Sequence, residues 1–130
     1  MRIVSAEEAV RVVQSRHQVF VQSAAATPSV LLEALVARSA ELEAVGMVHL
    51  HCEGPGPHLA PEMAPHFRHR ALFIGGSARR AIAEGRAEYI PVFLSDIPAL
   101  FTRRLIPLDV ALLNVSPPRR STAARSSRRS

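Results

Sequence analysis

Three side chains that can bind a metal or act as nucleophiles lie close together near the middle of the chain: His49, His51 and Cys52. Imidazole and thiolate are common zinc ligands, and two histidines two residues apart share one face of a strand. Their spacing matches no standard zinc motif, and the sequence identifies no base that would activate Cys52. We therefore assign no metal ligand and no catalytic residue here, and we expect the two histidines at a polar strand end that faces a cleft.

Two short segments of small and polar residues have the chemistry expected of anion-binding loops: Gln22–Thr27 and Gly75–Ser77. Each links an apolar run to a predicted helix, where free backbone N–H groups can meet an anionic group of a ligand. An ordinary structural connection is the alternative, since the glycine segment lacks the G-x-G-x-x-G and G-K-[ST] phosphate-binding patterns. The residues that we predict to line a substrate pocket are Gln22, Ser23, Ala24, Thr27, His51, Gly75, Gly76 and Ser77.

Strands and helices are predicted to alternate along the chain. Ser5 and Glu8 have the S-x-x-E form of a capping box, and Thr27-Pro28 is a typical helix start. The apolar runs show no alternation, which indicates an α/β fold with a mostly parallel sheet and helices on both faces. The proline-rich segment 54–65 is either an ordered excursion near a ligand or a simple connector. Helices are predicted over 6–14, 28–43, 78–84 and 98–103, and strands over 19–21, 48–51, 71–74, 89–94 and 110–115.

The positive charge of the chain is concentrated at its carboxyl end. The net charge is +5, but residues 1–118 carry 11 arginines and 11 carboxylates and are neutral, and the other five arginines lie in residues 119–130. This distribution argues against a nucleic-acid-binding body. Residues 119–130 contain no large apolar side chain and are expected to be disordered. This segment is either a functional basic tail or a non-native end of the chain.

The remaining composition is that of a small protein in a reducing compartment. The chain of 130 residues suits one domain, and its single cysteine excludes an intrachain disulfide. Acidic residues interrupt the amino terminus where a signal peptide needs an apolar stretch, and no apolar run approaches the length of a membrane span. We expect a cytoplasmic location.

Several blocks of sequence carry a more specific signal: residues 23–28 (SAAATP), 49–51 (HLH), 67–75 (FRHRALFIG), 79–98 and 108–118. In this order they resemble the amino-terminal domain of the acetyl-CoA hydrolase/transferase family, especially its 4-hydroxybutyrate CoA-transferase branch. The resemblance covers nearly all of residues 1–118. It departs from the family pattern at Ser23, where glycine is usual, and after Pro118.

The resemblance implies a class I CoA-transferase fold, here as a partial first domain of a two-domain enzyme with its active site between the domains. Such enzymes move coenzyme A from a short-chain acyl-CoA to a carboxylate such as acetate or 4-hydroxybutyrate. A glutamate forms an acyl anhydride and then a glutamyl-CoA thioester, which predicts ping-pong kinetics. That glutamate belongs to the carboxyl-terminal half, so the resemblance implies that this chain alone is inactive. Coenzyme A is then a substrate, and no permanently bound cofactor is expected.

Two further interpretations stay open at this point. Arg79, Arg80 and Arg86 form a solvated helix face or a site for the phosphates of coenzyme A. The alternative function is a non-enzymatic α/β module whose basic tail binds nucleic acid or an acidic protein. Strand edges or apolar surface that a missing domain would cover also make self-association an expectation.

Overall fold

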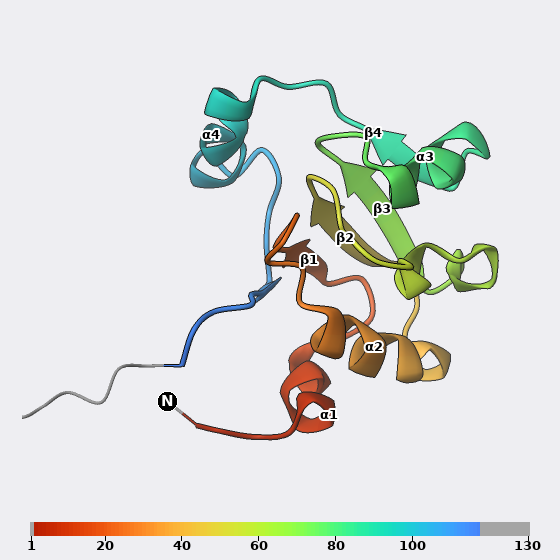
Figure 1. The fold of residues 1–130 in the computed structure, drawn as a ribbon, viewed down its shortest axis with the longest axis vertical. Helices are drawn as coiled ribbons and strands as arrows, with labels where there is room; N and C mark the ends of the chain where they lie inside the picture. The colour runs from red at the N-terminus through yellow and green to blue at the C-terminus, as the bar shows by residue number, and fades with distance from the viewer. Residues whose placement is uncertain (1, 118–130) are drawn as a thin grey trace, which may run out of the picture.

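The computed structural model, which describes residues 2–117, contains one sheet in which all strand pairs are parallel (Figure 1). The strands lie in the order β4-β3-β2-β1-β5. This arrangement confirms the predicted mostly parallel sheet. The strands are β1 (Gln18–Val21), β2 (Val45–His49), β3 (Phe67–Ala71), β4 (Ala87–Tyr89) and β5 (Val110–Leu112).

Helices cover both faces of this sheet, as predicted. The register aligns Val19 with Met47 and Met47 with His69, so these side chains share one face. Helices α1 (Ala6–Ala9) and α2 (Ser29–Ala37) pack on that face, and α3 (Gly76–Ala83) packs beside the edge strand β4. Helix α4 (Ile97–Thr102) covers the opposite face, where Phe101 contacts Phe20 edge to face.

Helix α1 begins at Ala6 as predicted, whereas α2 begins at Ser29, one residue after its predicted start, with Pro28 at the N-cap position. Both helices are shorter than predicted. The Ser5 hydroxyl accepts the Glu8 N–H at 3.1 Å, which is half of a capping box, but α1 has four residues and continues as a 3-10 turn over Val10–Val12. Helix α2 ends at Ala37, and a 3-10 turn follows at Ser39–Glu41. The Arg38 guanidinium donates to the carbonyls of Val10 and Val13 and so ties the end of α2 to the first turn.

Four strands are displaced from their predicted positions, and those predictions are wrong in register or length. β3 ends at Ala71, where the predicted strand 71–74 begins, and β4 covers Ala87–Tyr89 rather than 89–94. β2 ends at His49, and β5 ends at Leu112. β3 alternates buried and more exposed residues, so its two arginines conceal it from a search for continuous apolar runs.

The proline-rich segment between β2 and β3 is an ordered excursion. It forms 3-10 turns at Pro57–Leu59 and Pro61–Met63, and the first turn packs against α2, α3 and β3. No helix among residues 2–117 is long and apolar enough to cross a membrane. The predicted tail at 119–130 lies outside the described residues.

Candidate functional site

The loops that follow β1 and β2 are joined beyond the ends of the two strands. Ala24 and Cys52 form an isolated parallel bridge, and the Ala24 N–H donates to the His51 carbonyl at 2.9 Å. Because parallel strands end at the same edge of a sheet, the loops after them are neighbours in space. This carboxyl edge is where ligands bind in open α/β sheets.

Two hydroxyl groups of the first loop hold the second loop in place. The Ser23 hydroxyl accepts the Leu50 N–H at 3.0 Å. The Thr27 hydroxyl accepts the Glu53 N–H at 3.1 Å and donates to the Ala24 carbonyl at 2.6 Å. Both hydroxyls therefore form hydrogen bonds to backbone groups of the two loops. Their role in this structure is to hold the loops together, and neither is placed as a nucleophile.

The loop after β3 packs against the same structure. The Ser77 hydroxyl donates to the Cys52 carbonyl at 2.9 Å. A Cβ atom built on Gly75 would lie 2.5 Å from the Cβ of His51, so only glycine allows this approach without a shift. The His51 ring lies 5.4 Å from the Phe73 ring, centroid to centroid. The loop after β3 is thus the third loop at the carboxyl edge, beside the loops after β1 and β2.

Gln22 and Gly76 complete the set of predicted pocket residues. The Gln22 side-chain oxygen accepts the Asn114 N–H at 2.7 Å, and the Gln22 backbone N–H donates to the Leu112 carbonyl, so this residue faces β5. Gly76 lies in the first turn of α3, and no described atom lies within 4 Å of a Cβ built there. The structure therefore brings seven predicted residues together where the three loops meet and places Gln22 on their β5 side.

The expectation that His49 and His51 share a cleft-facing strand end is wrong. β2 ends at His49, whose side chain is completely buried, whereas His51 lies beyond the strand and is half-buried. His49 packs with His58 and His69, which come from the excursion and from β3. The spacing of His49, His51 and Cys52 could not reveal this cluster, because its other members lie 9 and 20 residues further along the chain.

Cys52 is buried, and its environment disfavours the thiolate. Desolvation by burial raises the pKa of its thiol from 9.0 to about 11. A thiol with such a pKa carries little charge at neutral pH and is a poor nucleophile. Its side chain belongs to the core, while its carbonyl serves the contact with Ser77.

Two of the three arginines of the helix α3 region pair with one carboxylate, that of Glu84. Arg80 and Arg86 both pair with Glu84, at 2.7 Å each, and Arg86 also donates to the Leu59 carbonyl at 2.6 Å. Arg79 is exposed. This arrangement favours a solvated and paired face over a phosphate site.

A hollow of about 710 Å³ lies elsewhere, towards the amino ends of β1 to β4. It is polar and open, and the ion pairs Arg70–Glu88 (3.7 Å) and Arg16–Glu43 (3.8 Å) lie along its walls. Ligand-binding loops of parallel sheets lie at the opposite edge. The carboxyl edge therefore stays the candidate site.

Comparison with known proteins gives a consistent result. The family model for the acetyl-CoA hydrolase/transferase N-terminal domain matches residues 1–123. The chain is 49% identical over 102 residues to a succinyl-CoA:acetate/propanoyl-CoA:succinate CoA transferase of Fasciola hepatica, which covers 77% of this chain and 21% of that protein. It is 38% identical over 117 residues to the 4-hydroxybutyrate coenzyme A transferase of Clostridium kluyveri, covering 90% and 27%. The chain thus spans about a quarter of the length of these relatives.

Solved structures show the same fold. A 4-hydroxybutyrate CoA-transferase from Porphyromonas gingivalis superposes with a TM-score of 0.64 at 28% identity, covering 86% of this chain and 24% of that one. RipA from Yersinia pestis superposes with a TM-score of 0.73 at 21% identity, covering 85% and 28%. At that identity the second comparison supports the architecture alone.

Proposed function

The chain belongs to the acetyl-CoA hydrolase/transferase family as its amino-terminal domain, and on this premise we propose that its carboxyl edge forms one wall of a CoA-transferase active site. The substrates would be a short-chain acyl-CoA and a carboxylate acceptor such as acetate or 4-hydroxybutyrate. The observation that carries the proposal is the convergence of the loops after β1, β2 and β3 into one cross-linked edge.

The proposed role of this edge is to bind and orient substrate. Loops held by three hydroxyl contacts offer fixed backbone groups to a thioester or carboxylate oxygen, and such preorganisation is what positions reacting groups. The reactive glutamate of the proposed mechanism would come from the carboxyl-terminal domain of the family, so we assign no catalytic residue to this chain. Turnover by this chain alone is therefore not expected.

Exposed apolar side chains support a covering domain at this edge. Phe73 follows β3, Phe93 and Leu94 follow β4, and Leu113 and Val115 follow β5. Phe93 and Leu94 keep 80% and 72% of their surface exposed. All five follow the carboxyl ends of strands, and exposed apolar groups of this size are typical of interaction surfaces. An inter-domain contact would bury them beside the substrate.

The direct experiment is amide-resolved NMR of the 130-residue chain titrated with acetyl-CoA, together with a CoA-transfer assay on the same sample. We expect shifts confined to Gln22–Thr27, His51 and Gly75–Ser77, and no turnover. Gly76→Asp adds a negative charge beside the proposed anion site and should weaken acetyl-CoA binding about tenfold. The substitution introduces an acidic residue into the first turn of α3, where a carboxylate favours the helix.

Gly85→Asp is the matched control, because it places the same charge beyond the other end of α3. Gly85 has a positive φ of 72° and no described atom within 4 Å of a built Cβ, and aspartate tolerates this conformation better than most residues. Acetyl-CoA binding should be unchanged in this variant. Shifts confined to Arg68 and Arg70 at the amino-end hollow, or turnover by the chain alone, would contradict the proposal.

A further inference from the structure

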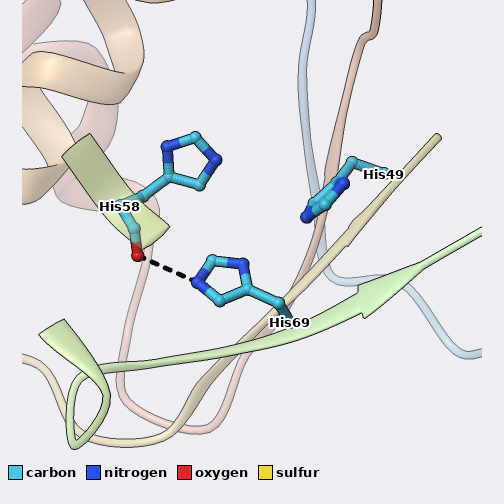
Figure 2. Close-up of side chains that lie close together, drawn as sticks. All are labelled: His49, His58 and His69. Carbon is cyan, nitrogen blue, oxygen red and sulfur yellow. Dashed lines mark hydrogen bonds between the residues drawn. The ribbon is translucent and has the colours of Figure 1, made fainter. Parts of the chain in front are cut away.

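Three histidine rings meet in the core of the protein, under the excursion between β2 and β3 (Figure 2). His49 comes from β2, His69 from β3 and His58 from the 3-10 turn above them. One ring nitrogen from each residue lies within 4.8 Å of the corresponding nitrogen of the other two. We propose that His49, His58 and His69 form a binding site for a divalent transition-metal ion of the zinc class. This proposal does not depend on the proposed CoA-transferase function.

The ring positions fit three imidazoles around one ion. The centroid separations are 5.4 Å, 5.6 Å and 6.1 Å. A tetrahedral Zn²⁺ with Zn–N bonds of about 2.0 to 2.1 Å would hold imidazole centroids about 5 Å apart. With the ligand nitrogens within 4.8 Å of one another, each would move inward by less than about 1 Å to reach a Zn–N distance of about 2.0 to 2.1 Å.

A single hydrogen bond of the His69 ring leaves its other nitrogen available as a ligand. Its Nε2 lies 2.9 Å from the His58 carbonyl, as the dashed line in Figure 2 marks. A carbonyl only accepts, so Nε2 must carry the proton and Nδ1 must carry the lone pair. Metal-binding histidines almost always donate their other N–H in this way, commonly to a backbone carbonyl.

The other ring nitrogens are buried without partners. Among residues 2–117, Nδ1 of His69 and both ring nitrogens of His49 and His58 make no hydrogen bond of normal geometry. Buried polar groups are almost always satisfied, and five orphaned nitrogens in one place call for an explanation. A metal ion would use three of them.

The charge state of the cluster suits a cation. Burial lowers the pKa of His49 and His69 to about 4 and that of His58 to about 3, so all three rings are neutral at pH 7. Neutral imidazole is the form that binds metals. The Arg86 guanidinium, whose charge acts on His69, is paired with Glu84 at 2.7 Å, which moderates its repulsion of a cation.

A small cavity borders His58 and brings solvent close to the cluster. Its volume is about 20 Å³, enough for one water molecule, and it lies between the start of α2 and the excursion. Glu33 and Glu53 line the cavity and are exposed, so carboxylates stand at its mouth. Three protein nitrogens leave the fourth position of a tetrahedral ion to water, the arrangement of open zinc sites.

The test uses the untagged 130-residue chain, stripped with a chelator and then dialysed against Zn²⁺ or Co²⁺. We expect one zinc per chain by elemental analysis and the visible absorption of tetrahedral Co²⁺. At a hundredfold excess over Kd, zinc should raise the melting temperature by roughly 10 °C. His58→Leu should weaken zinc binding at least a hundredfold and abolish this rise.

The control is His17→Gln, which changes a histidine outside the cluster and should leave zinc binding intact. If His58→Leu does not fold, the Co²⁺ spectrum of the unaltered chain and the effect of zinc on its melting temperature still test the proposed metal site. An unaltered chain that holds no stoichiometric zinc, or a folded His58→Leu variant that binds zinc as tightly, would overturn the proposal.

Discussion

Gly75 offers a sharp test of how the loops after β2 and β3 meet. Its φ of −88° and ψ of 174° are open to any residue, so Gly75→Ala carries no backbone penalty. The added Cβ would lie 2.5 Å from the Cβ and 3.3 Å from the Cγ of His51. Comfortable carbon contacts are about 3.5 to 4.0 Å, so the loops must separate by about 1 Å.

The expected loss of unfolding free energy is about 1 to 3 kcal/mol. The clash is with the first side-chain atom of His51, which rotation about χ1 does not move, so the backbone has to yield. Overpacking of this kind typically costs that amount. Urea denaturation followed by far-UV circular dichroism measures the loss.

Gly76→Ala is the matched control one residue later. No described atom lies within 4 Å of its built Cβ, and the residue opens α3, so alanine should be neutral or stabilise by up to about 1 kcal/mol. The two variants should therefore differ by at least about 1 kcal/mol. Equal stabilities would refute the contact between Gly75 and His51 and weaken the case for one continuous carboxyl edge.

Three further changes probe separate contacts. Burial raises the pKa of Cys52 to about 11, so the thiol loses its proton at a lower pH in the unfolded chain than in the folded one. The free energy of unfolding should therefore fall by about 1 kcal/mol between pH 8 and pH 10. Urea denaturation of Cys52→Ala over the same pH range should show a smaller fall. Thr27→Val leaves the Glu53 N–H without its acceptor and should cost about 1 to 3 kcal/mol in thermal unfolding, whereas Thr27→Ser should cost less. Arg38→Met removes both hydrogen bonds to the first turn and should increase amide exchange over residues 6–13.

The alternation of strands and helices could be predicted from the sequence, and the strand limits could not. The search for continuous apolar runs assumes that both faces of a parallel sheet are buried. In β3 the buried Phe67 and His69 alternate with Arg68 and Arg70, which line the hollow on the opposite face. The burial of β3 alternates from residue to residue, but the sequence does not show this alternation because the buried His69 is a polar residue.

The residues of the candidate edge were predictable because the rule that locates them is topological. Loops that follow parallel strands must meet, whatever their exact limits. The partners of the hydroxyl groups were not predictable, since Thr27 and Ser77 bond to backbone groups 26 and 25 residues away. The histidine cluster was missed for the same reason. Spacing rules detect ligands on one short segment, whereas His49, His58 and His69 meet only through the pairing of β2 with β3 and the fold of the excursion.

The amino-end hollow and the carboxyl edge are the two regions that could bind a substrate, and a second domain packed on this one would affect them differently. The amino-end hollow is large, but its walls are ion pairs between exposed side chains, which water already satisfies. A pocket formed between two domains has no enclosed volume in either domain alone, so the volume of the hollow does not decide between the two regions. One wall of an inter-domain site needs loops held in a fixed position and an exposed apolar surface that the second domain can cover. The hydroxyl contacts of Ser23, Thr27 and Ser77 supply the first, and exposed Phe73 and Phe93 supply the second.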